Sequence, residues 1–272
     1  MFKPYVKDGR ALSRQKGIAY IESVQKQLPE IDQYKARLIG WLNCVPYLRE
    51  SFRKNGICEE IFYESMKDFS YKFRECRAVY ETDGLFVDWF SLFFELKLFA
   101  LGRLQYEIST FEFDSYSSNG FKLKEGDIVY SCHIPSSGKL TTDLCMQSFQ
   151  KAYNFFNPYL NGEIIPIVCN TWLLYEPYIE AVFPNGSNLK QFSQLFDIIH
   201  LTQTGDKFED SWRVFNKFYN GTTEDLPDDN TLRRNFIKYI KNGGDFGVGY
   251  GIILYNGKTN KIVNQKSLAS KS

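Results

Sequence analysis

The spacing of hydrophobic residues changes at Gly102, and this change constrains the fold more than any other feature of the chain. Before Gly102, apolar residues recur at helical spacing over residues 10–28, 31–54 and 58–80. After it, residues 104–113 alternate apolar and polar side chains, as a half-buried strand does. We therefore expect an α+β protein with a helical N-terminal half and a strand-containing C-terminal half.

The most apolar stretch of the chain runs from residue 85 to residue 101. It carries Asp88, Glu95 and Lys97 and is shorter than the about 20 residues that a membrane-spanning helix needs. Its composition predicts a helix that is buried on most of its circumference. Asp88, Ser91 and Glu95 would share one polar stripe on this helix, facing either solvent or a ligand.

The C-terminal half alternates predicted strands and helices. The segment 114–126 is rich in Ser, Asn and Gly and is predicted to be a loop. Strands are predicted over residues 127–134, 164–174, 197–203 and 248–255, and helices over 141–156, 188–196, 209–219 and 231–241. This order predicts a mixed β-sheet flanked by helices.

Charge and cysteine content exclude several functional classes. The chain has 33 basic and 32 acidic residues, a net charge of +1, so no overall field attracts nucleic acid or an anionic membrane. Its six cysteines and two histidines do not cluster as zinc ligands do, and no metal site is predicted. The first residues lack an apolar signal core. We expect a cytoplasmic protein whose thiols are reduced and mostly buried.

A polar loop, His133-Ile-Pro-Ser-Ser-Gly-Lys-Leu-Thr141, joins a predicted strand to a predicted helix. The backbone N–H groups at a helix N-terminus, the helix dipole and the Lys139 ammonium together favour a bound phosphate. The loop is not a nucleotide-binding P-loop, because His133 replaces the first glycine and Leu140 follows the lysine where Ser or Thr would bind magnesium. The alternative interpretation is an ordinary turn in which Thr141 caps the helix.

A glycine-rich segment, residues 243–251, follows a predicted helix and opens a predicted strand. A dinucleotide-binding fingerprint needs the opposite order, so this segment is not one. Gly247, Gly249 and Gly251 would lie on one face of the strand and leave it bare. Another part of the protein, or a ligand, could then approach the backbone closely.

His133 is the strongest candidate for a catalytic residue, because it ends a predicted strand beside the polar loop. A neutral imidazole there could act as general base on an amine or a hydroxyl, although a structural histidine is the alternative. Cys132 should point to the opposite face of the strand, which argues against a Cys–His nucleophile. His200 lies in the middle of a predicted strand and is expected to be structural. Tyr175 follows a predicted strand end, where pockets form.

The order of these motifs resembles the two-domain bacterial acyltransferases that have a helical N-terminal domain and a GNAT-like C-terminal domain. The resemblance implies a helical N-terminal domain over residues 1–116 and a GNAT-like domain over residues 117–272. The matching residues are Trp89-Phe90, Phe94-Glu95, Leu101 to Glu107, His133-Ile134-Pro135, Leu140-Thr141, Trp172 to Leu174, Ser187 to Leu189, Phe192 and the glycines of residues 243–251.

The resemblance also implies a reaction: direct transfer of an acyl group from acetyl-CoA or another acyl-CoA to an amine or hydroxyl of a small-molecule acceptor. Glu107 and His133 become the candidate bases, and Tyr175 the candidate proton donor to the leaving thiolate. Of the family's glycine-rich pyrophosphate signature, only Gly138 is present. The alternatives are a non-catalytic acyl-CoA or small-ligand binding protein on the same fold, and a protein-interaction module built on the helical half. The implied pyrophosphate-binding residues are Ser136, Ser137, Gly138, Lys139, Leu140 and Thr141.

Overall fold

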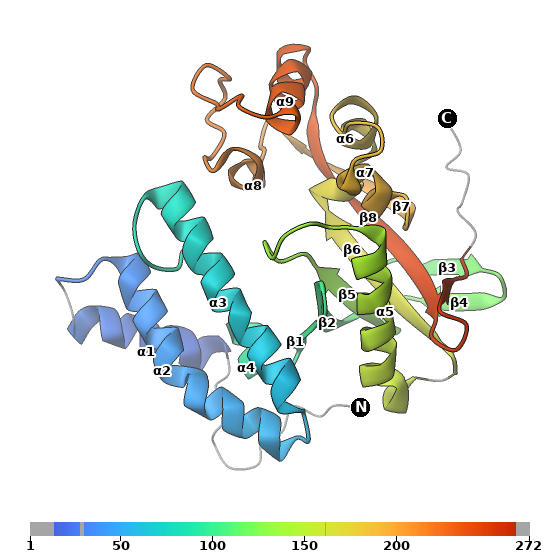
Figure 1. Cartoon of the computed structure of the whole chain (residues 1–272), viewed down its shortest axis with the longest axis horizontal. Helices are drawn as coiled ribbons and strands as arrows, with labels where there is room; N and C mark the ends of the chain where they lie inside the picture. The colour runs from blue at the N-terminus through green and yellow to red at the C-terminus, as the bar shows by residue number, and fades with distance from the viewer. Residues whose placement is uncertain (1–13, 28–29, 161, 265–272) are drawn as a thin grey trace. The chain divides into compact units, whose positions relative to one another are not determined.

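A computed structural model of the chain describes residues 14–27, 30–160 and 162–264 and divides into two compact units (Figure 1). The first unit comprises the described residues up to 108 together with residues 133–137. The second comprises residues 109–132 and the described residues from 138 onward. The predicted domain boundary cuts the chain once, after residue 116. The two units do not follow a single cut, because residues 133–137 lie with the first unit, and the boundary stays a prediction. In the described residues, no helix is both long enough and apolar enough to cross a membrane.

Three helices build most of the first unit: α1 (Arg14–Gln27), α2 (Gln33–Lys54) and α3 (Glu59–Tyr80). They confirm the three predicted helices, although residues 10–13 and 28 of the first lie outside the described residues. The Asp32 carboxylate caps α2 by accepting from two backbone N–H groups at 2.9 Å. Pro46 lies inside α2 and does not end it. Figure 1 shows the three helices side by side.

The long apolar helix predicted over residues 85–101 is wrong. This segment contains only one helical turn, α4 (Ser91–Phe94), and then the strand β1 (Leu98–Leu101). Four of its aromatic rings, those of Phe90, Phe93, Phe94 and Phe99, are buried, and Phe90 stacks on Phe69 of α3 with ring centroids 3.9 Å apart. An apolar run reports burial, but burial does not require helix when an irregular segment can fill the same space.

The polar side chains of this segment do not form the predicted stripe. The Asp88 carboxylate accepts from the Arg37 guanidinium at 2.9 Å, and Glu95 pairs with Lys97 at 2.9 Å. Asp88 therefore joins the segment to α2 and does not face a ligand as part of a helix.

A tight hairpin follows and completes the first unit. Strand β1 pairs antiparallel with β2 (Leu104–Thr110) through a two-residue turn in which Gly102 has φ +87°. The Ala100 N–H donates to the buried Ser65 hydroxyl of α3 at 3.2 Å. This hydrogen bond joins the hairpin to the first half of α3.

The second unit is built on a mixed sheet. Its strands are ordered β5 (Ile128–His133), β6 (Ile164–Thr171), β8 (Phe246–Asn256) and β7 (Asp197–Gly205), and β9 (Lys261–Ile262) pairs with β8. Strands β5 and β6 are parallel, whereas β8 is antiparallel to β6, β7 and β9. The four strands predicted for this half are confirmed, and His133 at the end of β5 belongs to the first unit.

The helices of this half are confirmed with some changes. The predicted helix over residues 188–196 is shorter, the one over 209–219 is reduced to one turn, and a short helix over residues 176–181 was not predicted. The strand predicted to reach residue 174 ends at Thr171, whose hydroxyl caps a short 3-10 turn, η2 (Trp172–Leu174), by accepting from Leu173 N–H at 3.3 Å. The helices are α5 (Thr142–Phe156), η1 (Asn157–Tyr159), α6 (Glu176–Ala181), α7 (Asn188–Ser193), α8 (Ser211–Phe215) and α9 (Thr231–Lys241).

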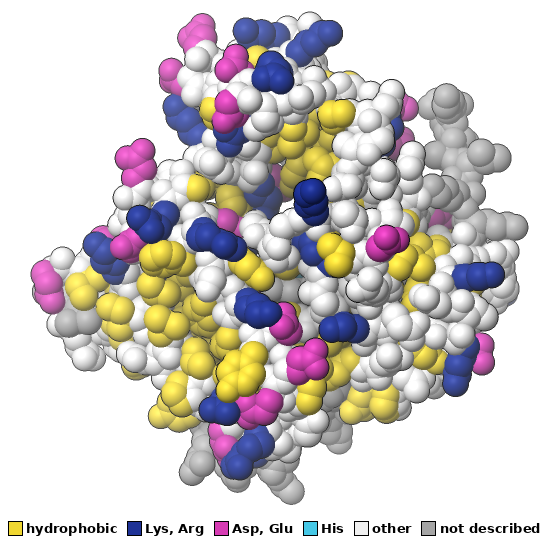
Figure 2. All heavy atoms as spheres, viewed as in Figure 1, with side chains coloured by type: hydrophobic (Ala, Val, Ile, Leu, Met, Phe, Trp, Pro, Cys, Tyr) yellow, Lys and Arg dark blue, Asp and Glu magenta, His cyan; other side chains and the backbone are white. Residues whose placement is uncertain are grey.

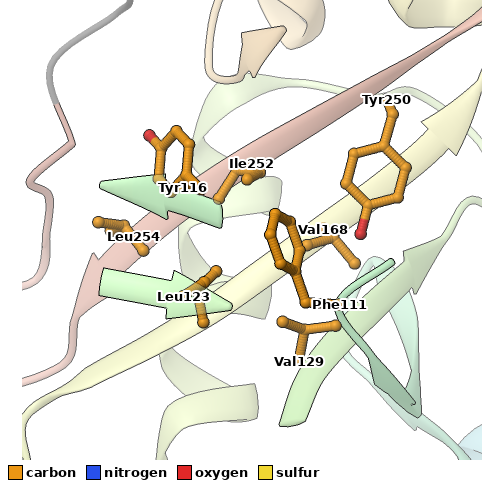
Figure 3. Close-up of a cluster of buried hydrophobic side chains, with 8 residues drawn as sticks. All are labelled: Phe111, Tyr116, Leu123, Val129, Val168, Tyr250, Ile252 and Leu254. Carbon is orange, nitrogen blue, oxygen red and sulfur yellow. The ribbon is translucent and has the colours of Figure 1, made fainter. Parts of the chain in front are cut away.

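The segment 114–126, predicted to be a loop, is instead a hairpin of β3 (Ser115–Ser118) and β4 (Phe121–Lys124). The hairpin covers one face of the sheet because Tyr116 and Leu123 point inward between polar neighbours. Four-residue strands of mostly polar residues carry too short an alternation to be recognised from sequence. Figure 3 shows the resulting cluster, formed by Phe111, Tyr116, Leu123, Val129, Val168, Tyr250, Ile252 and Leu254.

The opposite face of the sheet packs on α5. The Tyr255 ring lies 5.9 Å from the Phe149 ring, and the Tyr255 hydroxyl donates to Gln150 Oε1 at 2.7 Å. Tyr130 of β5 packs on Phe156, with ring centroids 4.2 Å apart. Successive strand residues therefore alternate between the hairpin and α5, as the pleat requires.

The bare glycine face of β8 packs against the protein itself. A Cβ atom on Gly249 would lie 2.0 Å from the carbonyl oxygen of Leu174, and one on Gly247 would lie 2.4 Å from the Tyr175 ring. A Cβ atom on Gly251 would lie 2.8 Å from a Leu174 methyl carbon. The close-packing interpretation of these glycines is confirmed, since η2 and Tyr175 occupy the space that side chains would need.

Buried tyrosines make the second unit sensitive to alkaline pH. Burial raises the pKa of Tyr116, Tyr130 and Tyr175 from 10 to about 12. The folded state therefore holds these protons more tightly than the unfolded state, and the associated stability is complete below pH 10 and lost as the pH approaches 12. We expect the free energy of unfolding to fall by about 1.4 kcal/mol per pH unit for each such tyrosine.

This alkaline unfolding is measured by following tyrosinate absorbance and far-UV circular dichroism together. We expect the two signals to change in one cooperative step. Tyr130→Phe removes one of the titrating groups and should move the midpoint to higher pH. Smooth ionisation of the tyrosines in a protein that keeps its circular dichroism would contradict the prediction.

Candidate active site

The two side chains named as candidate bases form one pair. His133 Nε2 lies 2.9 Å from Glu107 Oε2, and each side chain is 26% exposed. The pair lies entirely within the first unit, because the end of β5 belongs there with β2. When the imidazole donates from Nε2 to a carboxylate, the lone pair is on Nδ1. The carboxylate then orients the ring and stabilises the imidazolium that forms when Nδ1 takes a proton.

Trp89 and Gln105 hold the His133 ring in place. The Trp89 ring meets the imidazole edge-on, at 79° and with centroids 4.6 Å apart. Its indole Nε1–H donates to Gln105 Oε1 at 3.4 Å. Gln105 is 2% exposed and lies two residues before Glu107, on the same face of β2. Sequence reasoning gave these two residues no role, although a buried glutamine one strand period from a candidate base is a recognisable signal.

Two side chains, from the β1–β2 turn and from α3, form hydrogen bonds with the residues after His133. The Pro135 carbonyl accepts from the Arg103 guanidinium at 3.0 Å, and the Ser136 hydroxyl donates to Glu75 Oε1 at 2.5 Å. Glu75 in turn pairs with Lys72 at 3.0 Å, and both side chains are buried. The sequence analysis assigned no role to Glu75 or Lys72, because only the fold brings them to this segment.

The rest of the predicted phosphate loop lies in the second unit. Gly138 has φ +119°, a conformation that favours glycine. The Leu140 side chain is buried, so only its backbone could face a phosphate. The Thr141 hydroxyl accepts from Leu144 N–H at 3.4 Å, which confirms the predicted cap of α5. Lys139 is exposed, and Asp143 places a negative charge in the first turn. Phosphate binding by this loop stays a prediction.

Tyr175 lies in the second unit, where it is 1% exposed. Its hydroxyl donates to Asp245 Oδ2 at 2.9 Å, and Tyr239 donates to the other oxygen of that carboxylate at 3.0 Å. Burial, followed by the hydrogen bond to Asp245, raises the pKa of Tyr175 to about 12. These contacts give Tyr175 a structural role beside the glycines of β8, and its role as proton donor stays a prediction.

The cysteines provide no activated thiolate in the sheet. Five of the six are buried, and Cys58 is exposed. Burial raises the pKa of the Cys132 thiol well above its ordinary value, so the thiol keeps its proton. The Cys132 carbonyl accepts from the Cys169 thiol at 3.3 Å. Across the residues that the structure describes, no cluster of three or more His, Cys, Asp or Glu side chains could hold a metal ion.

The visible surface carries both signs of charge. Figure 2 shows Lys and Arg side chains interspersed with Asp and Glu on this face, without a broad field of one sign. This distribution agrees with the net charge of +1. Selectivity for a charged ligand therefore has to come from local groups such as Lys139 and Arg103.

Comparison with known proteins identifies both halves of the chain. Residues 10–96 match the model of an N-acyltransferase N-terminal domain, and residues 98–253, more than half of the chain, match that of a GNAT-like C-terminal domain. No curated protein matches the chain.

Solved structures of acyltransferases share the fold. One, in complex with decanoyl-CoA and teicoplanin, is 22% identical, with a TM-score of 0.68 over 82% of this chain and 67% of the other. An acyltransferase mutant in complex with octanoyl-CoA is 21% identical, with a TM-score of 0.67 and the same coverage. These similarities confirm the predicted fold, a helical N-terminal part followed by a GNAT-like mixed sheet with helices. The chain belongs to the family of acyltransferases that combine an N-acyltransferase N-terminal domain with a GNAT-like C-terminal domain.

Proposed function

We propose that this protein transfers an acyl group from acyl-CoA directly to an amine or hydroxyl of a small-molecule acceptor, with His133 as general base and Glu107 as its orienting carboxylate. The observation that carries the proposal is the 2.9 Å contact between two partly exposed side chains on neighbouring segments of the first unit. Such a pair can accept a proton from a substrate group, and its partial exposure leaves it open to a substrate.

The proposed step moves one proton and exchanges one bond. The acceptor nitrogen or oxygen attacks the thioester carbonyl while Nδ1 of His133 takes the acceptor's proton. The tetrahedral intermediate then collapses, the C–S bond breaks, and the CoA thiolate leaves and takes up a proton. We retain Tyr175 as a candidate donor of that proton. Direct transfer is supported by the protonated, buried state of Cys132, which leaves that thiol unsuited to form an acyl-enzyme.

The acyl-CoA donor is proposed from the family and from the ligands of the similar structures. Acyltransferases of this fold have been solved with decanoyl-CoA and octanoyl-CoA. In this chain, the backbone N–H groups at the start of α5 and the Lys139 ammonium would hold the CoA pyrophosphate. We propose Ser136, Ser137, Gly138, Lys139, Leu140 and Thr141 as this donor-binding loop, in which Ser136 would contribute its backbone and not its hydroxyl, because that hydroxyl donates to Glu75.

One observation favours a second function, the binding of an acyl-CoA without transfer. The loop keeps only Gly138 of the family's glycine-rich signature, which reduces the number of backbone N–H groups that can approach a pyrophosphate. Measuring acyl transfer and acyl-CoA binding with the same acyl-CoAs distinguishes the two functions. Thermal-shift assays with CoA, acetyl-CoA and decanoyl-CoA report binding, because a native-state ligand at a hundredfold its Kd adds about 2.7 kcal/mol of stability.

Transfer itself is measured as free CoA thiol released in the presence of a panel of amines and alcohols. Mass spectrometry of the acceptor should find the acylated product, and the protein should show no added acyl mass. Stabilisation by acyl-CoA without thiol release from any acceptor would favour the binding protein. An acyl-protein adduct that decays with turnover would overturn direct transfer.

Lys139→Glu should weaken CoA binding by about tenfold or more, because it replaces a cation beside the proposed diphosphate with an anion. Isothermal titration calorimetry with CoA measures the change. The matched control is Lys151→Glu, which makes the same charge reversal in the third turn of α5 and should leave the affinity near that of the unmodified protein. Equal CoA affinity in both variants would remove Lys139 from the donor site.

A further inference from the structure

We propose that Glu75 is a positioning residue for His133, acting through Ser136, and that buried Lys72 holds the Glu75 carboxylate in place. This inference deepens the proposed function and rests on it for its catalytic meaning. It assigns to α3 of the helical domain a specific part in arranging the catalytic base.

The geometry of residues 133–137 points to this role. The segment leaves the sheet of the second unit and belongs, by its contacts, to the first. His133 is held by Glu107 and Trp89, Pro135 by Arg103, and Ser136 by Glu75. Three of these five residues are thus held by side chains from α3, from the segment before β1 or from the β1–β2 hairpin. Two of these contacts lie within three residues of His133 and limit the backbone that carries the imidazole.

The Lys72–Glu75 pair is costly where it lies. The two side chains are only 7% and 9% exposed and are joined at 3.0 Å. The attraction within a buried ion pair often does not repay the full desolvation cost of its two charges, and apolar residues of similar size often stabilise a protein as much or more. Stabilisation of the fold alone therefore does not account for the buried Lys72–Glu75 pair. It does place a carboxylate oxygen, in low-dielectric surroundings, at 2.5 Å from the Ser136 hydroxyl.

The contact also bears on how Ser136 could take part in the reaction. Its hydroxyl has one proton, and that proton is donated to Glu75. A phosphate oxygen needs a donor, so the hydroxyl cannot serve Glu75 and a pyrophosphate at the same time. The inference therefore predicts that loss of this hydroxyl disturbs the base and leaves donor affinity nearly unchanged.

The first test uses the fact that the chain has only two histidines. Two imidazole Cε1–H resonances are expected in an NMR spectrum of the full chain, and His133→Gln assigns them. Ser136→Ala should shift the His133 resonance, which the nearby Trp89 ring makes sensitive to small movements, and leave that of His200 in place. Ser136→Thr keeps a hydroxyl and should restore the original position. Ser70→Ala, on the exposed side of α3, is the matched control and should move neither resonance.

The second test separates position from binding by kinetics. Ser136→Ala should lower kcat by about tenfold, since a small misplacement of a catalytic group can cost up to a hundredfold, and change the KM for acyl-CoA by less than about twofold. Glu75→Gln, which removes the negative charge that pairs with the buried Lys72 ammonium, should move the His133 resonance as well. In the double variant the two effects on kcat should not add, because both substitutions act through one contact.

The outcomes are distinguishable. An unmoved His133 resonance in Ser136→Ala would overturn the inference whatever the activity, and so would a raised KM for acyl-CoA with unchanged kcat, which would make Ser136 a donor ligand. A shifted resonance in a protein that transfers no acyl group would support the positioning of His133 and count against the proposed function. Should Glu75→Gln fail to fold, Ser136→Ala decides alone, because it truncates a single exposed side chain.

Discussion

Turnover of His133→Gln is expected to fall by about a hundredfold or more, the low end for loss of a general base, while acyl-CoA affinity stays close to that of the unmodified protein. Glutamine can keep a hydrogen bond to Glu107 but cannot take a proton from the acceptor. Release of CoA thiol under saturating substrates measures kcat, and calorimetry measures donor binding. The matched control is His200→Gln, at an exposed position of β7, which should keep full activity.

Glu107→Gln adds a second arm to this experiment. It removes the charge that orients the imidazole and stabilises the imidazolium, so kcat should fall, but less than in His133→Gln. The double variant should be no slower than His133→Gln alone, because the two residues act as a unit. Equal turnover of His133→Gln and the unmodified protein at pH values around neutrality would show that His133 is structural. The proposed role of Glu107 as its orienting carboxylate would then fall as well.

Gly249→Ala should cause the largest loss of stability from any single methyl group added to the sheet. The new Cβ atom would lie 2.0 Å from the carbonyl oxygen of Leu174, so η2 or β8 must move. We expect a loss of about 3 kcal/mol, the upper end for overpacking a core, because the obstacle is backbone and cannot turn aside. The corresponding fall in Tm is about 6–12 °C for a protein of this size.

The control for this prediction is Gly120→Asn at the tip of the β3–β4 hairpin. Gly120 has φ +80°, which asparagine tolerates, and a Cβ atom added there would meet no neighbour within 4 Å among the described residues. Calorimetric unfolding of both variants should separate them clearly. A Gly249→Ala protein as stable as the Gly120→Asn protein would show that the strand can shift at little cost and that the bare glycine face is not required for packing.

The apolar pattern of residues 85–101 predicted burial correctly but predicted the wrong backbone conformation, a long helix. Phe90 and Phe94 are buried as expected, and Phe94 packs on Trp41 with ring centroids 5.2 Å apart. The helices α2 and α3 offer an apolar surface, and an irregular segment with one helical turn fills it. Hydrophobic burial depends on area removed from water and not on the dihedral angles of the residue that is buried.

Local chemistry in the sequence was sufficient to predict much of the fold. Helices α2 and α3, the capped start of α5 at Thr141 and the strands β2, β5, β6, β7 and β8 follow from periods of 3.6 and 2 and from capping residues, which act over a few positions. The bare face of Gly247, Gly249 and Gly251 also follows from the strand period. The sequence could not say what covers that face, because the covering residues depend on how η2 returns to β8.

The candidate site was predicted only in part. His133 was recognisable at a strand end, and Glu107 was named beside it from the family resemblance. Only the tertiary structure brings Nε2 of His133 to 2.9 Å from Glu107, and only it carries Ser136 to Glu75, 61 positions away in the chain. A side-chain contact between distant segments depends on strand register, helix packing and the path of the connecting loops together. No local sequence pattern determines these three features together. The candidate base could therefore be named from the sequence, whereas the side chains that support it could be identified only in the tertiary structure.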